Sequence, residues 1–534
     1  MHSSRLLRTT SAVLAATVLL AVSGCTSARS GGDGGPKATS ESNERAIGDP
    51  HAPQLKPLPT TVPAGLRRYY HQKLSWHGCG DGVECARMKA PLDYRHPDPG
   101  TDLRLAVARK KASGHGKPIG SLMLNPGGPG GSAVDYLKQA GLAYPAEVRD
   151  RYDLVGMDPR GVATSEPVRC LTDKQMDAFT ATDQTPDSRR ETGQLVAAYE
   201  QFAQGCKKRS GRLLGHLSTI DAARDMDVLR SVLGDKKLHY VGASYGTYLG
   251  ATYAGLFPQR SGRLVLDGAM DPTLSMLRVN REQTGGFTTA FQAFAKDCVR
   301  RSGCPLGRKS PEDAAHRLGA FFKKLDAHPL PTGERRKLTE SLASTGVIRS
   351  MYDQESWPGL REALSAAKKG DGGQLLTLAD DYYERDPDGH FGNMMYANTA
   401  VNCLDLPPAF RSPAQVRRAQ PSFEKASPVF GRGFAWAALN CGYWSQRPSG
   451  RPHRIAASGA DPILVVGTTR DPATPYRWAR GLAGQLSSGR LLTYRGDGHT
   501  AYLRGGSCIN TAVDTYLLKG KAPANGKSCS PSGP

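Results

Sequence analysis

Ser244 is the residue whose surroundings point most directly to chemistry, because it lies in a Gly-x-Ser-x-Gly turn between an apolar run and a helical pattern. This order is typical of a nucleophile elbow, a sharp strand-to-helix turn that presents a serine hydroxyl to a cleft. Gly242 and Gly246 fit such a turn, since larger side chains would crowd its backbone. The pentapeptide alone also arises by chance in long chains, so other residues must support the hypothesis.

A serine hydroxyl is a weak nucleophile near neutral pH and needs a base and a group that orients this base. Asp471 and His499 each follow an expected strand, in the chain order that an elbow of this type requires. Taken singly, either could be a turn or surface residue. Asp497 is the second candidate for the acid, whereas Asp461 precedes its strand and would lie at the wrong end of the sheet. The pattern predicts a triad of Ser244, Asp471 and His499.

The oxyanion of an acyl-transfer intermediate needs preorganised N–H donors. The amide of Tyr245, directly after the serine, is one expected donor. The second is expected from the glycine-rich loop Asn-Pro-Gly-Gly-Pro-Gly-Gly at 125–131, which follows a strand. A phosphate-binding loop is the rival interpretation, but this loop lacks both the G-K-[ST] signature and the G-x-G-x-x-G register.

The elements that must position these residues alternate between short apolar runs and helical patterns. The expected strands lie at 103–108, 119–124, 152–157, 263–267, 462–467 and 490–494, besides the strand that leads into the elbow. The expected helices of this part lie at 221–233 and 511–518. Their order predicts an α/β-hydrolase fold, in which a mainly parallel sheet flanked by helices projects chemistry from the carboxyl ends of its strands.

Helical patterns dominate the middle of the chain and predict a mainly helical cap inserted between core strands. Its expected helices lie at 282–295, 311–327, 357–369 and 374–384. The predicted organisation is therefore a signal peptide at 1–24, a tether at 25–60, core at 61–272, cap at 273–458 and core again at 459–534, which carries Asp471 and His499.

The first residues are typical of an export signal, because arginines precede an apolar stretch, 12–22, that is too short to span a bilayer stably. The stretch ends in Val-Ser-Gly-Cys25, and small residues before a cysteine resemble the lipobox of bacterial lipoproteins. Cys25 would then be lipidated and become the new N-terminus. An ordinary secretory signal with an unrelated cysteine is the alternative. We expect an enzyme tethered to the outer face of the cell membrane, from which processing could release it.

The ten cysteines other than Cys25 form an even set, which indicates up to five disulfides in an oxidising compartment. Pairing between sequence neighbours is the simplest of many connectivities. No cysteine or histidine cluster has zinc spacing, so we expect neither a metal nor an organic cofactor. The net charge of +21 comes from dispersed basic residues without a nucleic-acid-binding module, so we expect no nucleic-acid partner. We expect a monomer.

In combination, four motifs resemble the tripeptidyl aminopeptidases related to proline iminopeptidases, from about residue 74 to 529. The motifs are the glycine-rich loop, the segment 153–165, the elbow and the segment 263–268. The resemblance implies Ser244 as nucleophile with Asp471 and His499 as partners, and the amides of Gly127 and Tyr245 as oxyanion donors. It also implies that the floor of the active site is shaped, without a catalytic role, by Asp158, Arg160 and Gly161.

The substrate that the resemblance implies is a peptide with a free N-terminus, whose ammonium group must pair with carboxylates. Asp405 and Glu355 are the candidate partners, and a solvated carboxylate is the alternative for each. Product length does not transfer, because family members release tripeptides or single prolines. The expected function is a serine exopeptidase that removes short peptides such as tripeptides. An esterase or lipase with the same triad and a peptide-binding lipoprotein are the alternatives.

Overall fold

In the computed structural model, which describes residues 49–531, one ten-stranded sheet has the order β1-β2-β3-β5-β4-β6-β7-β8-β9-β10. β1, β2, β3 and β5 pair antiparallel in that order, and the other neighbouring strands pair parallel. The strands are β1 (His77–Gly78), β2 (Glu84–Ala90), β3 (Leu103–Lys110), β4 (Gly120–Asn125), β5 (Tyr152–Met157), β6 (Leu238–Ala243), β7 (Ser261–Asp267), β8 (Ile463–Arg470), β9 (Gly489–Asp497) and β10 (Lys527–Cys529). This is the α/β-hydrolase architecture that the sequence predicts.

Helices cover both faces of the sheet, which explains why its central strands are nearly continuous apolar runs. Leu229, Leu249 and Leu482 bring α6, α7 and α16 onto one face, and Leu137 and Val513 bring α2 and α17 onto the other. The helices of the core are α1 (Arg67–Tyr70), α2 (Ala133–Ala140), α3 (Ala146–Arg149), α6 (Thr219–Val232), α7 (Tyr245–Leu256), α16 (Tyr476–Gln485) and α17 (Ser507–Lys519).

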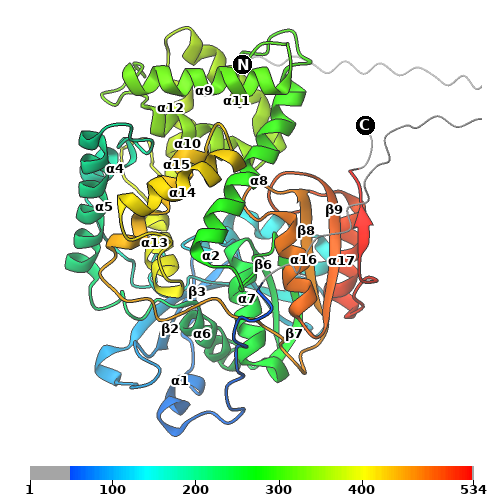
Figure 1. The fold of residues 1–534 in the computed structure, drawn as a ribbon. Coiled ribbons are helices and arrows are strands. Elements are labelled where there is room, and N and C mark those ends of the chain that lie inside the picture. Colours follow the sequence, from blue (N-terminus) through cyan, green and yellow to red (C-terminus); the bar gives the residue numbers. More distant parts are fainter. Residues whose placement is uncertain (1–48, 532–534) are drawn as a thin grey trace, which may run out of the picture. The chain divides into compact units, whose positions relative to one another are not determined.

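A second, helical layer lies between β7 and β8 in the chain (Figure 1). Its helices are α8 (Met276–Cys298), α9 (Pro311–Ala327), α10 (Glu340–Met351), α11 (Trp357–Lys368), α12 (Gly373–Tyr383), α13 (Met394–Asp405), α14 (Pro413–Ala426) and α15 (Gly431–Ala437). The long helix α8 runs from the sheet into this layer, because it contacts β8 as well as α9, α14 and α15. We call this layer the cap.

The cap also receives helices from an earlier part of the chain. α4 (Asp173–Thr180) and α5 (Arg189–Ser210) follow β5, yet Leu195 and Tyr199 of α5 pack in one cluster with Phe423 of α14 and Trp436 of α15. The predicted cap helices correspond to α8, α9, α11 and α12, whereas α4, α5, α10 and α13 to α15 were not predicted from the sequence. The cap is thus built from two separate insertions.

Five disulfides join sequence neighbours, which confirms the simplest predicted pairing. They are Cys79–Cys85, Cys170–Cys206, Cys298–Cys304, Cys403–Cys441 and Cys508–Cys529. Three of them involve the cap or the helices that join it, and Cys508–Cys529 ties α17 to the edge strand β10. A native disulfide typically contributes about 2 to 4 kcal/mol to stability.

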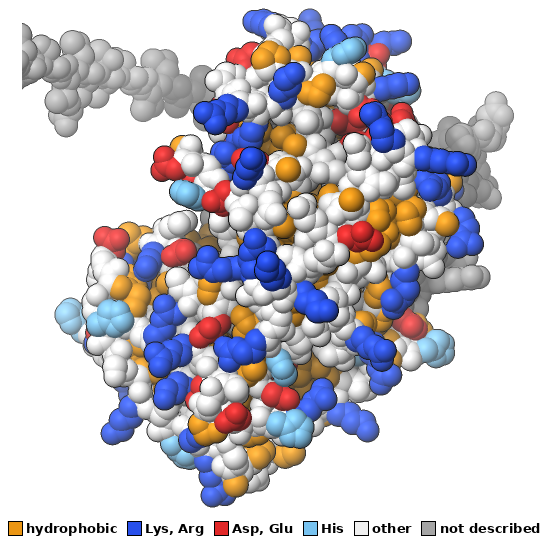
Figure 2. Space-filling view, turned by 90° about the vertical axis from the view of Figure 1, so that its left-hand side faces the viewer, with side chains coloured by type: hydrophobic (Ala, Val, Ile, Leu, Met, Phe, Trp, Pro, Cys, Tyr) orange, Lys and Arg blue, Asp and Glu red, His pale blue; other side chains and the backbone are white. Residues whose placement is uncertain are grey.

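The predicted signal peptide and Cys25 lie outside the described residues, as does most of the predicted tether. The described part of that tether, 49–60, packs against the core, since the amides of Leu55 and Leu58 donate to the carbonyls of Arg454 and Leu256 at 2.8 and 2.9 Å. Within 49–531, no helix has the length and apolar character that crossing a membrane requires. Figure 2 shows Lys and Arg side chains scattered over the visible face, with Asp and Glu among them.

Candidate active site

Ser244 occupies the sharp turn between β6 and α7. Its backbone has φ 56° and ψ −124°, a region that side-chain-bearing residues rarely adopt, and its amide donates to the carbonyl of Asp267 at 2.9 Å. A Cβ atom at Gly242 would lie 2.5 Å from the carbonyl oxygen of Gly246, and one at Gly246 would lie 2.8 Å from Oδ1 of Asn125. The two glycines are therefore required by space, and the turn has the geometry of a nucleophile elbow.

His499 and Asp471 meet at the carboxyl ends of β9 and β8. Nδ1 of His499 lies 2.8 and 2.9 Å from the two carboxylate oxygens of Asp471, and both side chains are buried or nearly so. The other ring nitrogen, Nε2, is buried and has no hydrogen-bond partner within residues 49–531. A proton on Nδ1 directed at the carboxylate leaves Nε2 as an acceptor, which is the tautomer that a general base for a serine hydroxyl needs.

Backbone amides hold the carboxylate of Asp471 in place. Oδ1 accepts hydrogen bonds from the amides of Ala473 at 2.9 Å and Thr474 at 2.8 Å, and Oδ2 accepts one from the amide of Thr500 at 3.2 Å. The hydroxyl of Thr474 also lies 3.4 Å from Nδ1 of His499. The carboxylate is thereby fixed against the ring with its negative charge stabilised at a site that water does not reach.

The other two acids considered from sequence have different partners. Arg470 donates from Nε and Nη2 to the two oxygens of Asp497, at 2.6 and 2.7 Å, so this carboxylate is turned away from the histidine. Asp461 pairs with Nζ of Lys237 at 2.7 Å before the start of β8. Of these three carboxylates, only that of Asp471 contacts His499.

Asp267 supports the histidine loop, a role that sequence reasoning missed. Its buried carboxylate accepts hydrogen bonds from the amides of Ala501 at 2.9 and 3.0 Å and Tyr502 at 2.8 Å, and burial raises the pKa of Asp267 to about 6. Gly268 follows, and a Cβ atom there would lie 3.1 Å from Cε1 of His499. Ser244 is bonded to the carbonyl of Asp267, so the serine and the histidine flank the end of β7. The position of Asp267 at the end of a strand, in the segment 263–268, is the feature of the sequence that could have indicated this role.

The glycine-rich loop packs directly on the elbow. A Cβ atom at Gly127, whose φ is +97°, would lie 2.4 Å from the carbonyl oxygen of Ala243, 2.9 Å from Cβ of Ser244 and 3.1 Å from the amide nitrogen of Tyr245. Tyr245 is the first residue of α7, so its amide has no acceptor in the preceding turn. The two segments therefore bring backbone N–H groups close to the serine.

The expected second donor is occupied in this structure. The amide of Gly127 donates to Oδ1 of Asn125 at 3.0 Å, because the loop turns back on its own first side chain. The following amide, that of the exposed Gly128, has no acceptor in the described part of the chain. The amide of Tyr245, directly after the nucleophile, thus remains open to an oxyanion, and Gly128 supplies the next amide of the glycine-rich loop without an acceptor.

The three residues expected to shape the floor of the active site connect the loop after β5 to neighbouring segments. The carboxylate of Asp158 accepts a hydrogen bond from Oγ of Ser132 at 2.8 Å, directly after the glycine-rich loop. Arg160 is buried and donates from Nε and Nη2 to the two oxygens of Asp225 at 2.7 Å, which joins the loop after β5 to α6. Gly161 has φ +83° and accommodates the turn. None of the three contacts the histidine or its acid partner.

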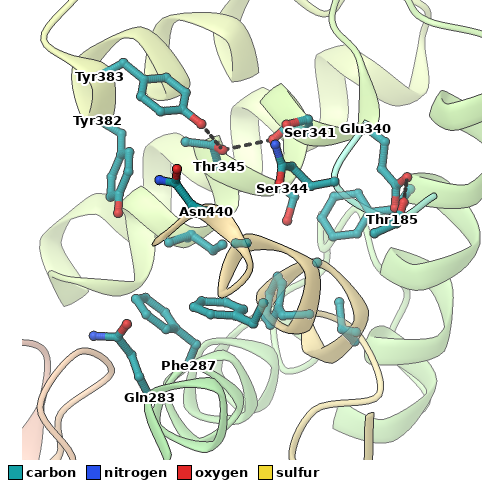
Figure 3. Close-up of a pocket in the computed structure, with 18 of the residues that line it drawn as sticks. Thr185, Gln283, Phe287, Glu340, Ser341, Ser344, Thr345, Tyr382, Tyr383 and Asn440 are labelled. Carbon is teal, nitrogen blue, oxygen red and sulfur yellow. Dashed lines mark hydrogen bonds between the residues drawn. The ribbon is translucent and has the colours of Figure 1, made fainter. Parts of the chain in front are cut away.

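A cavity of about 250 Å³ lies in the cap (Figure 3), and its lining includes neither His499 nor the other two residues of the predicted triad. Tyr352, which follows α10, lines it and places its ring edge-on to the ring of His499, with the centroids 5.5 Å apart. The carbonyl of Tyr352 also accepts the backbone hydrogen bond of His499 at 2.8 Å. Gln283 of α8 lines the cavity and donates to the carbonyl of Ala473 at 2.8 Å. Hydrogen bonds therefore join the cap to the loop that carries the base and to the loop that carries its acid partner.

Known proteins resemble this chain over most of its length. The family model described as TAP-like protein matches residues 427–529. The serine protease Hip1 of Mycobacterium tuberculosis is 37% identical over 462 residues, which cover 84% of this chain and 87% of that protein. The tripeptidyl aminopeptidase of Streptomyces lividans is 31% identical over 491 residues, which cover 86% and 87% of the two chains. The chain belongs to the tripeptidyl aminopeptidase-like (TAP-like) family.

Relatives in the TAP-like family carry the names of different activities. Carboxylesterase B of Mycobacterium tuberculosis is also 37% identical, over 503 residues that cover 91% of this chain and 94% of that protein. Among solved structures, a proline iminopeptidase from Mycobacterium smegmatis covers 81% of this chain and 98% of its own, at 15% identity and a TM-score of 0.34. Family membership makes the chain a serine hydrolase, and the His499–Asp471 pair beside the elbow agrees with it.

The two carboxylates expected to bind a substrate ammonium group do not line the cavity of this TAP-like chain. Asp405, at the end of α13, is buried and accepts hydrogen bonds from the amide of Thr219 at 2.9 Å and from its hydroxyl at 2.5 Å. That hydroxyl also lies 2.6 Å from the phenol oxygen of Tyr245. Asp405 thus ties a cap helix to the start of α6 and to the residue after the nucleophile. Glu355 is exposed, in the short turn before α11.

Replacing Gly127 by alanine tests the contact between the glycine-rich loop and the elbow. The added methyl group cannot fit 2.4 Å from a carbonyl oxygen, so Ser244 and Tyr245 must shift. Displacements of about 1 Å in an active site cost on the order of 100-fold in rate. We expect kcat to fall by at least that factor, measured with a tripeptidyl p-nitroanilide. Gly193→Ala in α5, where nothing lies within 4 Å, is the matched control and should leave kcat unchanged.

Burial raises the pKa of the Asp405 carboxyl to about 7, against two hydrogen bonds from Thr219 that favour the ionised form. The folded chain therefore binds a proton that the unfolded chain releases between about pH 4 and 7, and stability falls as pH rises through this window. We expect Asp405→Asn to remove part of this slope, measured by urea unfolding at pH 5, 6, 7 and 8. Parallel stability curves for the two proteins would contradict the assignment.

Proposed function

We propose that this TAP-like chain is a serine exopeptidase that removes short peptides, tripeptides among them, from free N-termini, and that it acts outside the cell membrane while anchored by lipid at Cys25. The observation that carries the proposal is the hydrogen bond between His499 and Asp471, which leaves a buried Nε2 without a partner in the described part of the chain, in a loop that the cap contacts through Tyr352. No step requires a metal or an organic cofactor.

In the proposed mechanism, Oγ of Ser244 attacks the scissile carbonyl carbon while Nε2 of His499 takes the hydroxyl proton. The carboxylate of Asp471 holds the imidazolium that forms. The oxyanion accepts hydrogen bonds from the amide of Tyr245 and from an amide of the glycine-rich loop, that of Gly128 in the conformation described above. The imidazolium then donates its proton to the leaving amine, and a water molecule activated by the same histidine hydrolyses the acyl-enzyme.

Two observations support action on chain ends rather than on the interior of proteins. A cavity lies within the cap and is lined by residues of both insertions, so the cap offers a bounded space in which one end of a peptide could be recognised. A relative that shares 31% of its residues over 86% of this chain is named a tripeptidyl aminopeptidase. The proposal of tripeptide release rests on this relative.

The proposed location rests on the sequence before the folded unit. The Val-Ser-Gly-Cys25 motif follows an apolar stretch, which is the order in lipoprotein signals. Five disulfides in the described part of the chain are typical of proteins that fold outside the reducing cytosol. A net charge of +21 would also favour contact with an anionic envelope.

An esterase is the second candidate function, because carboxylesterase B is as similar to this chain as the serine protease Hip1. Both activities pass through an acyl-enzyme on the same triad, so the geometry around Ser244 does not separate them. The two activities differ in the leaving group, which is an alcohol for an esterase and an amine for a peptidase. They also differ in whether the substrate needs a free ammonium group.

Ser244→Ala tests the chemistry, and an acetylated substrate tests the substrate class. We expect the variant to lose about 10⁶-fold in kcat and to resist labelling by a fluorophosphonate, while keeping the thermal unfolding midpoint of the wild type. With the wild type, we expect acetylation of trialanyl p-nitroanilide to lower kcat/KM by about 100-fold, because an ammonium contact is lost. Faster turnover of p-nitrophenyl butyrate than of the free peptide would favour the esterase, and an unlabelled Ser244 would favour a peptide-binding lipoprotein.

Cys25→Ala tests the anchor. We expect the wild-type chain, expressed in a bacterium that processes lipoproteins, to incorporate labelled palmitate and to sediment with membranes. The variant should lose the label and appear in the soluble extracytoplasmic fraction with unchanged kcat/KM, because Cys25 has no part in the proposed acyl-transfer chemistry. Ser27→Ala is a neighbouring control that should behave as the wild type. An unlabelled wild-type chain would contradict the proposal.

A further inference from the structure

The loop that carries the catalytic base has an unfavourable backbone conformation. The histidine loop, residues 498–503, lies between β9 and α17 and belongs to neither element. Thr500 and Leu503 have φ angles of 67° and 71°, in the left-handed region that residues with a side chain rarely adopt, and Gly498 has φ 88°. Such conformations cost free energy and persist only where surrounding contacts fix them. The contacts of this loop therefore decide where the imidazole of His499 lies.

Five successive backbone amides of the loop, from His499 to Leu503, donate to groups outside it. Their acceptors, in chain order, are the carbonyl of Tyr352 at 2.8 Å, Oδ2 of Asp471 at 3.2 Å, the carboxylate of Asp267 for the next two amides at 2.8 to 3.0 Å, and Oδ1 of Asn510 at 3.0 Å. None of the five amides is left to bond within the loop. Its shape therefore depends on these external acceptors, and Asp267 serves two of the five amides.

Arg504, the residue after the loop, supplies hydrogen-bond donors to the carbonyl groups around the base. Its Nε donates to the carbonyl of His499 at 3.1 Å, and its Nη2 donates to the carbonyls of Asp497 at 3.0 Å and of Thr500. The guanidinium lies directly over Gly498, where a Cβ atom would be 2.7 Å from Nη2. A lysine could not make the same contacts, because its ammonium group lacks the planar fork of a guanidinium.

Asp267 and Arg504 bind the histidine loop from two sides. Asp267 is 3% exposed and accepts hydrogen bonds from amides, whereas Arg504 is exposed and donates to carbonyls. Burial raises the pKa of Asp267 to about 6, and the positive charge of Arg504 is among the influences that oppose this rise. The ionised carboxylate is the form in which both oxygens can accept from the loop amides. The two side chains thus act on the same loop and on each other.

The main chain of Asp267 extends this arrangement to the nucleophile. Its carbonyl accepts the hydrogen bond from the amide of Ser244 at 2.9 Å, and the next amide, that of Gly268, donates to the carbonyl of Val466 in β8 at 3.1 Å. A Cβ atom at Gly268 would lie 3.1 Å from Cε1 of His499, so the end of β7 packs against the ring. One residue therefore bonds the serine turn through its carbonyl and the histidine loop through its carboxylate.

We infer that Asp267 and Arg504 are positioning residues, which together hold the histidine loop so that Nε2 of His499 meets the hydroxyl of Ser244. Neither side chain contacts a ring nitrogen, since Nδ1 faces Asp471 and Thr474 and Nε2 has no partner in the described part of the chain. The inference rests on the acyl-transfer mechanism proposed above and adds two residues to it. It applies equally to an amine and to an alcohol as the leaving group.

Arg504→Lys tests the inference, because it keeps the positive charge and removes the fork. Displacements of about 1 Å in an active site cost on the order of 100-fold in rate. We expect kcat for trialanyl p-nitroanilide to fall by about 10- to 100-fold and KM to stay within about twofold. The rate at which a fluorophosphonate labels Ser244 should fall in parallel with kcat, since it needs the base but not the peptide.

Arg495→Lys is the matched control for this variant. Arg495 is an exposed arginine of β9 whose Nε donates to Oγ of Ser528 at 2.7 Å, a contact outside the histidine loop. We expect this control to keep kcat, KM and the labelling rate of the wild type.

Asp267→Asn provides the second variant. The NH₂ group of the asparagine would face backbone N–H donors, so we expect kcat to fall by about 100-fold with KM within about twofold. The double variant should lose less than the product of the two single losses, because both residues hold the same loop. If Asp267→Asn does not fold, Arg504→Lys decides the inference alone, since the side chain of Arg504 is exposed.

The outcomes separate this inference from the mechanism on which it rests. Full activity of Ser244→Ala would overturn the mechanism. An inactive Ser244→Ala together with wild-type kcat in Arg504→Lys would overturn only the positioning roles, as would a rise in KM at unchanged kcat. Because rates are expressed per labelled serine, a lower unfolding midpoint with an unchanged rate would indicate a contribution to stability alone and would also overturn them.

Discussion

The hydrogen bond between Asp471 and His499 is the constraint on which the rest of the site depends. A histidine can act as a base for a serine only if its ring is held in one orientation and one tautomer, and the carboxylate at 2.8 Å achieves both. The carboxylate itself is fixed by three backbone amides, two from its own loop and one from Thr500. Asp267 then fixes the loop beyond the histidine through Ala501 and Tyr502. Two buried carboxylates thus position one imidazole, from the ends of neighbouring parallel strands.

The same constraint involves the cap in catalysis. The amide of His499 donates to Tyr352 at the end of α10, and Gln283 of α8 donates to the loop that follows Asp471. A movement of the cap would therefore alter the loops that carry the base and its acid. On the opposite side, Asp405 joins the end of α13 to Thr219 and, through its hydroxyl, to Tyr245. These hydrogen bonds connect the cap to the loops of the base and its acid and, through Thr219, to the residue after Ser244.

The sequence predicted what is set locally. The elbow, the strand ends before Asp471 and His499, and the neighbour pairing of the cysteines follow from short stretches of chain whose residues limit their own backbone. It failed where distant segments decide. Asp405 is buried against α6, and Glu340 is brought to a cavity between helices from two insertions. No spacing along the chain shows which carboxylates of a helical region share a cavity.

The net charge of the whole molecule is positive, whereas several carboxylates cluster in the cap. The two sets of charges act over different distances. A net charge of +21 repels an incoming ammonium group only weakly beyond the screening length of about 8 Å at physiological salt. Around the buried carboxylates of the cap, burial removes most of this screening, so Glu340, Asp183 and the nearby Arg432 act strongly on one another. A basic surface can then act on the surroundings of the protein, while the buried carboxylates of the cap act only at short range. The core would supply the same acyl-transfer chemistry to any substrate that reaches Ser244, so the proposed specificity must come from residues outside the triad.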